Sequence, residues 1–192
     1  MSQTSTVTAS TPTSTDATTS PDREELTWEL FGTASRELSA QVVASGWVPD
    51  LIIAVARGGL IPAGAISYAI GVKAMGSMNV EFYTGIGETL AEPVVLPPLM
   101  DVSAMDGKRV LVVDDVADSG KTLKMVMELL RHEGLQLGGA SVPVEARSAC
   151  IYLKPRSVHR PDYVWRETDK WINFPWSVAP VITQENLAVL GL

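Results

Sequence analysis

The sequence predicts an α/β fold with a mainly parallel, twisted sheet flanked by helices. Two continuous apolar runs, residues 51–56 and 110–113, have the length and composition of buried strands. Each run is followed by a short turn and then by a segment with helical periodicity, residues 60–70 and 121–131. Strands that alternate with helices in this way are typical of a parallel sheet with helices on both faces.

Before the first strand, the sequence predicts a disordered Ser/Thr-rich tail over residues 1–20 and an amphipathic helix over residues 21–45. The tail has neither the basic segment nor the apolar segment of a secretory signal. In the helix, apolar residues recur every four positions, and Ser20-Pro21 supplies a cap and a proline at the first helical position. We therefore expect the tail to precede one domain that spans residues 21–192.

The remaining segments alternate between apolar runs and irregular stretches. In chain order we expect a strand over residues 74–83, an irregular segment over 84–107, a loop over 134–146, a strand over 148–153, an aromatic-rich region over 161–177 and a short helix over 183–190. The irregular segment contains several Gly and Pro residues, and its length leaves open whether it is an active-site lid or a β-hairpin.

Composition narrows the class of protein. A net charge of −7 without a basic run argues against a nucleic-acid partner. No apolar run reaches the ~18 residues that a membrane-spanning helix needs, so we expect a cytoplasmic protein with no membrane contact. The single cysteine, Cys150, excludes an internal disulfide, and its apolar neighbours favour packing in the core over reactivity.

Three carboxylates and a phosphate-binding pattern follow the apolar run at residues 110–113. Asp114 and Asp115 come directly after the expected strand and suit either ribose hydroxyls or a Mg²⁺ ion held partly through waters. The next residues, 118–122, place hydroxyls, an ammonium and backbone N–H groups at a helix start, which suits a phosphate monoester. The plainer alternatives are a solvated acidic strand end and a simple Ser or Asp helix cap.

Two further observations bear on the kind of phosphate site. A P-loop interpretation of Gly120-Lys121-Thr122 fails, because that motif needs a glycine five residues before Gly120 and Asp115 stands there. The turn after the other apolar run, residues 57–59, carries an arginine and two glycines. Glycines let backbone amides approach an anion closely, although a tight turn alone would also need them.

These segments together resemble the type I phosphoribosyltransferases. Residues 112–122 resemble the motif that binds 5-phosphoribosyl 1-pyrophosphate (PRPP), and residues 55–60 resemble the pyrophosphate loop. Lys154-Pro155 and the run at residues 171–176 resemble the base-binding part of bacterial xanthine-guanine phosphoribosyltransferases. The resemblance covers most of the chain and implies the type I fold, with a small hood built from the N-terminal helix and the C-terminal segment.

The resemblance implies an enzyme of purine salvage. In the implied reaction, a 6-oxopurine (guanine, xanthine or hypoxanthine) displaces pyrophosphate from PRPP and gives a nucleoside 5′-monophosphate. The implied cofactor is Mg²⁺, the implied partners are the two small-molecule substrates, and the implied assembly is a homodimer or homotetramer. The protein's contribution would be mainly positioning and charge stabilisation.

The resemblance also implies roles for individual residues. Asp114 and Asp115 would hold the ribose and Mg²⁺, and Asp118 would be the catalytic base beside the purine imidazole. Lys154 would donate to the 6-oxo oxygen, Trp171 would stack on the base, and the main chain of Ile172 would read its edge. The implied 5′-phosphate site consists of Asp118, Ser119, Gly120, Lys121 and Thr122. Pyrophosphate would be bound by Arg57, Gly58 and Gly59, which follow an implied cis peptide at Ala56–Arg57. Tyr83 and Thr84 would belong to a lid.

An alternative function on the same fold is a PRPP- or nucleotide-binding regulator with little catalysis. The expected lid motivates it, because no Lys or Arg occurs between Val80 and Gly107 although a lid over pyrophosphate would gain from cations. Transfer to a pyrimidine is a third possibility, against which Lys154 and Trp171 argue.

Overall fold

The computed structural model describes residues 22–81, 108–137 and 140–185, together with short strands at residues 84–85, 88–89 and 94–95. The expected Ser/Thr-rich tail over residues 1–20 lies outside the described residues, as does nearly all of the expected C-terminal helix. The three residues at the start of that expected helix, 183–185, are not helical.

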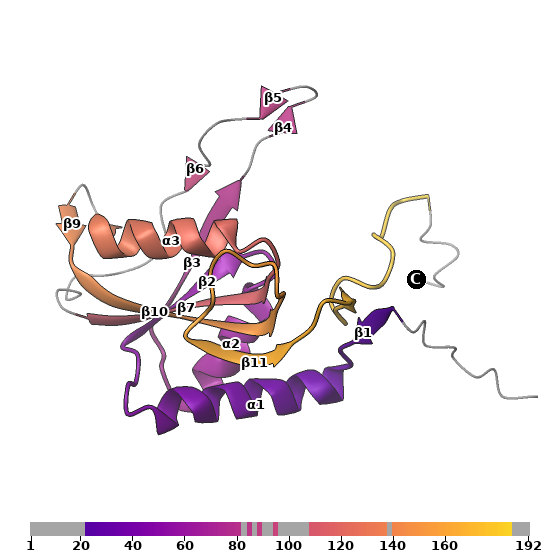
Figure 1. The fold of residues 1–192 in the computed structure, drawn as a ribbon, viewed down its shortest axis with the longest axis horizontal. Helices are drawn as coiled ribbons and strands as arrows, with labels where there is room; N and C mark the ends of the chain where they lie inside the picture. The colour runs from indigo at the N-terminus through magenta and orange to yellow at the C-terminus, as the bar shows by residue number, and fades with distance from the viewer. Residues whose placement is uncertain are drawn as a thin grey trace, which may run out of the picture.

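A six-stranded sheet forms the centre of the molecule (Figure 1). Its order is β11-β10-β7-β2-β3-β6, and every pairing is parallel except that of β6 with β3. The strands are β2 (Leu51–Ala56), β3 (Met75–Glu81), β6 (Val94–Val95), β7 (Lys108–Ala117), β10 (Val144–Leu153) and β11 (Tyr163–Glu167). The predicted mainly parallel sheet is confirmed.

Helices cover both faces of this sheet. Helix α1 (Trp28–Ala44) and helix α2 (Leu60–Ile70) lie on one face, and helix α3 (Lys121–His132) lies on the other (Figure 1). Alternate residues of β2 and β7 enter the two cores, because successive side chains of a strand point to opposite faces: Ile52 and Leu111 pack with α1 and α2, while Ile53 and Val112 pack with α3. Cys150 is fully buried in the α3 core, as its neighbours predicted.

The start of the predicted N-terminal helix is wrong. Residues 23–25 form strand β1 (Arg23–Glu25) instead, and helix α1 begins only after Thr27, whose Oγ1 accepts from the Leu30 N–H at 3.2 Å. Thr27 is therefore the cap, in place of Ser20. Strand β1 pairs in parallel with β12 (Trp171–Asn173), and helix α1 also contacts the C-terminal segment, because the rings of Trp28 and Phe31 lie against that of Trp176.

Three further elements differ from the sequence prediction. Residues predicted as a loop before β10 form an antiparallel hairpin of β8 (Leu135–Leu137) and β9 (Ala140–Val142), and β10 itself begins at Val144. In the expected irregular segment, β4 (Thr84–Gly85) and β5 (Glu88–Thr89) pair antiparallel, which favours the hairpin interpretation. Pairing between strands, which local periodicity does not report, stabilises each of these segments.

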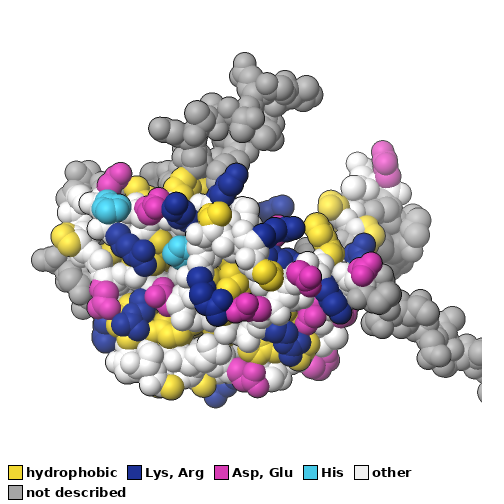
Figure 2. All heavy atoms as spheres, viewed as in Figure 1, with side chains coloured by type: hydrophobic (Ala, Val, Ile, Leu, Met, Phe, Trp, Pro, Cys, Tyr) yellow, Lys and Arg dark blue, Asp and Glu magenta, His cyan; other side chains and the backbone are white. Residues whose placement is uncertain are grey.

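The described surface carries both signs of charge. Figure 2 shows Lys and Arg side chains interspersed with Asp and Glu side chains over the described part of one face. No helix among the described residues is long and apolar enough to cross a membrane.

Candidate functional site

The predicted site residues meet at one edge of the sheet. Strands β2, β7 and β10 are neighbours and run parallel, so their carboxyl ends lie side by side. Arg57 follows β2, Asp114 and Asp115 lie near the end of β7, and Lys154 follows β10. The carboxyl edge of a parallel sheet is where open α/β folds bind ligands, and the chain places its candidate side chains there.

The carboxylate pair lies within strand β7, which continues to Ala117 rather than ending at Val113 as predicted. The Asp115 N–H donates to Asp114 Oδ1 at 2.9 Å. Burial raises the pKa of Asp115 to about 6, and hydrogen bonding from neighbours, including the Trp176 side chain, opposes this shift. Burial, followed by the charge of Asp115, raises the pKa of Asp114 well above its usual value. The solvated acidic strand end considered above is therefore wrong for these two residues.

The first candidate anion-binding turn, residues 57–59, lies directly against this pair. A Cβ on Gly58 would overlap the Asp115 carboxylate, and one on Gly59 would overlap the main chain of Val55 and Val113. The peptide between Ala56 and Arg57 is cis, as the resemblance implied. Glycine is thus required here for space, which brings the backbone of residues 58–59 next to the carboxylates.

The second candidate anion-binding turn opens helix α3. Gly120 is its N-cap with a φ of 72°, so the N-cap residue is neither the Ser nor the Asp of the plainer alternative. The Lys121 N–H lies 3.4 Å from Ser119 Oγ. The first N–H groups of an α-helix have no partner within the helix, so in α3 those of Thr122 and Leu123, next to the Lys121 N–H that donates to Ser119, suit an anion.

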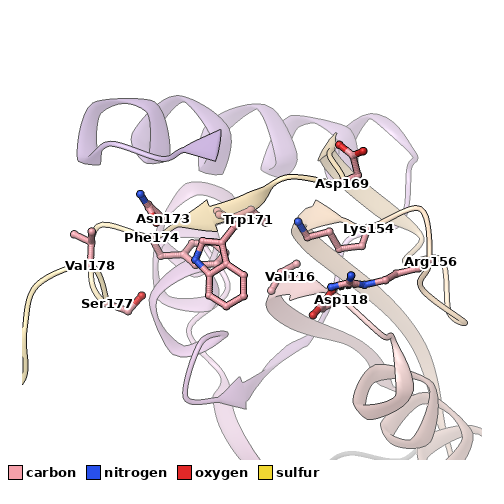
Figure 3. Close-up of a pocket in the computed structure, with 11 residues that line it drawn as sticks. Val116, Asp118, Lys154, Arg156, Asp169, Trp171, Asn173, Phe174, Ser177 and Val178 are labelled. Atoms are coloured by element: carbon pink, nitrogen blue, oxygen red, sulfur yellow. Dashed lines mark hydrogen bonds and ion pairs between the residues drawn. The ribbon is translucent and has the colours of Figure 1, made fainter. Parts of the chain in front are cut away.

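A third feature is a pocket of about 330 Å³ between this turn and the C-terminal segment. Its lining includes Asp118, Lys154, Trp171 and Ile172, so four predicted residues from distant parts of the sequence meet (Figure 3). In that view the Lys154 ammonium lies above Val116, and the Trp171 ring lies to the left of both. Trp171 is 69 % exposed, which leaves its ring open to a flat ligand, whereas Ile172 is buried.

Pairing of the C-terminal segment with strand β1 holds this pocket wall. Trp171 and Ile172 are held by the parallel pairing of β12 with β1, in register with Arg23 and Glu24. The Lys154 ammonium donates to the Lys170 carbonyl. Burial lowers the pKa of Lys154, while the negative charge of Asp118 opposes that shift. Lys154 is thus a partly desolvated donor at the mouth of a pocket with one aromatic wall.

A second pocket of about 850 Å³ adjoins the carboxylates. It is lined by Arg57 and Gly58 of the first turn, by Asp115, and by Trp176 of the C-terminal segment, among others. The Trp176 ring also stacks on Phe174, with ring centroids 5.0 Å apart. Trp176 therefore packs in an aromatic cluster and also borders this pocket.

Comparison with known proteins agrees with this geometry. Residues 24–182 match the family model described as the phosphoribosyl transferase domain. The chain belongs to this phosphoribosyltransferase family. It is 35% identical over 158 residues to xanthine-guanine phosphoribosyltransferase of Gluconobacter oxydans, with 81% of this chain and 85% of the relative covered. It is 30% identical over 169 residues to the protein of that name from Idiomarina loihiensis, covering 84% and 94%.

A solved structure also matches this phosphoribosyltransferase. The purine phosphoribosyltransferase of Pyrococcus horikoshii aligns with a TM-score of 0.66 and 38% identity over 85% of this chain and 99% of the other. The shared architecture confirms the type I fold. The family and its named members establish the chain as a transferase enzyme, which favours catalysis over the regulator considered from sequence.

Sequence reasoning missed one residue of the phosphoribosyltransferase site. Arg156 lines the 330 Å³ pocket and contacts Asp118, with its Nε 2.9 Å from Asp118 Oδ1. In the sequence, the feature that could have indicated Arg156 was its position two residues after Lys154. Of the two expected lid residues, Tyr83 lies outside the described residues, and Thr84 is described only as the first residue of β4.

The raised pKa of Asp115 predicts how the free energy of unfolding depends on pH. Between its usual pKa of 3.8 and about 6, the folded chain holds a proton that the unfolded chain has lost, so this group's contribution to the free energy of unfolding falls as pH rises. Asp115→Asn removes that contribution. We expect its free energy of unfolding, relative to wild type, to increase between about pH 4 and about pH 7 in urea titrations. A difference that stays constant with pH would contradict the buried, proton-binding carboxyl.

Proposed function

We propose that this phosphoribosyltransferase transfers the 5-phosphoribosyl group of PRPP to a 6-oxopurine and releases pyrophosphate. The observation that carries the proposal is the convergence of two anion-binding turns, a carboxylate pair between them and a pocket with an aromatic wall and a cation. PRPP has phosphates at both ends and a ribose between, so it needs those three parts in that order. The relatives named for xanthine, guanine and purine support a purine acceptor.

In this proposal, residues 118–122 bind the 5′-phosphate through the N–H groups at the start of α3. Arg57, Gly58 and Gly59 bind pyrophosphate. Asp114 and Asp115 accept hydrogen bonds from the ribose hydroxyls between the two turns. The half-buried carboxylates gain most when a cation or hydroxyl donors replace the water they have lost, which fits a ligand site rather than a structural pair.

The same pair fits Mg²⁺. This cation prefers oxygen ligands and is often held by one or two carboxylates together with substrate phosphates and waters. Among the described residues, no group of three or more His, Cys, Asp and Glu side chains could enclose a metal alone. Mg²⁺ held by Asp114 and Asp115 would therefore depend on PRPP for its remaining ligands, and it would supply charge neutralisation for the departing pyrophosphate.

The base enters the pocket between Lys154 and Trp171. The Lys154 ammonium donates to the purine 6-oxo oxygen, the exposed Trp171 ring stacks on the base, and the main chain of Ile172 reads its edge. As the purine nitrogen bonds to ribose C1, the bond from C1 to the pyrophosphate oxygen breaks. Asp118, in the wall of the same pocket, accepts the proton that the imidazole ring loses.

A panel of bases tests the proposal. Purified full-length protein is incubated with PRPP, Mg²⁺ and guanine, xanthine, hypoxanthine, adenine or uracil, and nucleoside 5′-monophosphate is measured by chromatography. We expect product with at least one of the first three and none with uracil. Folded protein that makes no product with any 6-oxopurine would refute the proposed acceptor class.

Lys154→Ala is expected to raise the KM for the 6-oxopurine by about tenfold to a hundredfold, because a hydrogen bond from a charged donor contributes ~1.5–3 kcal/mol. The KM for PRPP should change little. Lys124→Ala is the matched control, since Lys124 pairs with Glu128 on the outer surface of α3. Initial rates at varied base concentration measure both variants, and unchanged base kinetics in Lys154→Ala would refute this assignment.

The homodimer or homotetramer expected from the resemblance also remains a proposal. Helix α2 supports it, because Leu60, Ile61 and Tyr68 are exposed on its surface. The molar mass in solution, measured by light scattering, tests it: a monomer at micromolar concentration would refute it.

A further inference from the structure

Arg156 and Asp118 form an ion pair in the base pocket. None of the roles proposed above involves Arg156. Arg156 Nε lies 2.9 Å from Asp118 Oδ1, and Nη2 of the same guanidinium also contacts Oδ1. Figure 3 shows the guanidinium lying against the Asp118 carboxylate. Both side chains line the pocket that also contains Lys154 and Trp171.

Stability does not account for this pair. The Arg156 and Asp118 side chains are 68% and 51% exposed, and ion pairs in such positions contribute only ~0–1 kcal/mol. The loop that carries Arg156 is held by other contacts. The Ser157 N–H donates to the Lys154 carbonyl at 3.0 Å, and the Val158 N–H donates to the Ser119 carbonyl at 3.0 Å.

These backbone contacts fix Arg156 relative to the helix-start turn. The loop packs so closely on that turn that a Cβ on Gly120 would overlap Ser157 Oγ. The backbone of Arg156 therefore has a defined position, from which its guanidinium reaches Asp118. An arginine that is anchored in this way can restrain a partner side chain that otherwise rotates freely in solvent.

The contact also distinguishes the two oxygens of Asp118. Both guanidinium nitrogens donate to Oδ1, whereas Oδ2 accepts no hydrogen bond from any residue in the described part of the chain. One oxygen is thus held and the other is left for a ligand. A proton acceptor works best when its reacting atom is already in place, because misplacement by about 1 Å can cost a hundredfold in rate.

We propose that Arg156 is a positioning residue for Asp118, which it holds so that Oδ2 can accept the proton of the purine imidazole. The inference rests on the proposed function, in which Asp118 is the general base. Arg156 contacts neither substrate in this scheme and acts only through the carboxylate. Its loss should therefore lower kcat rather than weaken PRPP binding.

The first test compares three variants of the full-length enzyme. Arg156→Ala is expected to lower kcat by about twofold to fivefold, the most that an exposed ion pair can bias the position of the carboxylate, with little change in the KM for PRPP. Arg156→Lys should recover part of that loss, since an ammonium can contact Oδ1 but lacks the planar fork. Arg160→Ala is the matched control: Arg160 lies in the same loop, is 69% exposed and pairs with Glu167 at 2.7 Å, outside the pocket.

The second test asks whether Arg156 acts through Asp118. In an Asp118→Asn background, Arg156→Ala should cost no further activity, because effects of residues that act as one unit are not additive. A full additional loss in the double variant, or a higher KM for PRPP, would show that Arg156 contacts substrate itself and would overturn the inference. Equal kcat in Arg156→Ala and Arg160→Ala would also overturn it.

The outcomes separate this inference from the proposed function. A wild-type enzyme that makes no nucleotide would refute the function. An active wild-type enzyme with an unaffected Arg156→Ala variant would refute only the positioning role. Thermal melting of each variant shows whether it is folded, and the exposed pair should shift the midpoint by only a few degrees at most.

Discussion

Replacing Asp118 with asparagine is expected to lower kcat by about a hundredfold to ten-thousandfold, the usual contribution of a positioned general base. The amide keeps the size of the side chain but cannot accept the imidazole proton. PRPP binding should persist, because the proposed 5′-phosphate site consists mainly of backbone N–H groups at the start of α3. Initial rates at saturating PRPP and varied base measure the loss, and a PRPP-dependent rise in melting temperature measures the retained binding.

The pocket offers a matched control for this prediction. Asp169 is a second carboxylate in the lining of the same pocket, so Asp169→Asn removes the same charge from the same cavity. It should reduce kcat far less than Asp118→Asn does. If Asp169→Asn were the more damaging change, the base would be Asp169 and the assignment of Asp118 would be wrong.

The elements that the sequence predicted well are those whose signal is local. Strand β2 and helix α2 match their expected bounds, since a continuous apolar run followed by a helix that ends at glycine leaves little freedom. The predicted start of α1 failed because Ser20-Pro21 is only one possible cap. Thr27 competes with it, and pairing of β1 with β12 across almost the whole chain decides between them.

The candidate site likewise has residues that the sequence predicted and residues that it did not. The carboxylates and the two anion-binding turns follow strands directly, so parallel pairing alone brings Asp114, Asp115 and Gly58 together. Arg156 was missed because a charged side chain in a loop has no periodicity, and its contact with Asp118 spans 38 residues of sequence. The approach of the Trp176 side chain to Asp115 was also not predictable, since the two residues are far apart in the sequence.

Gly58→Ala is expected to lower kcat/KM for PRPP by about a hundredfold or more. The added methyl group would occupy the position of the Asp115 carboxylate, so either the carboxylate or the pyrophosphate turn must move. Either movement would separate the proposed pyrophosphate turn from the carboxylate that is proposed to hold the ribose. The bond that breaks lies between these two sites. The strain should also lower the free energy of unfolding by about 1–3 kcal/mol, as overpacking in a close-packed site does.

Gly64→Ala is the matched control for this change. Gly64 lies in helix α2, and a Cβ there meets nothing within 4 Å, so activity should persist and stability should rise by up to about 1 kcal/mol. The cause of the Gly58 effect can be tested separately with Asp115→Ala, which removes the atoms in conflict. In that background Gly58→Ala should lose most of its cost in urea unfolding, whereas an unchanged cost would locate the conflict elsewhere in the turn.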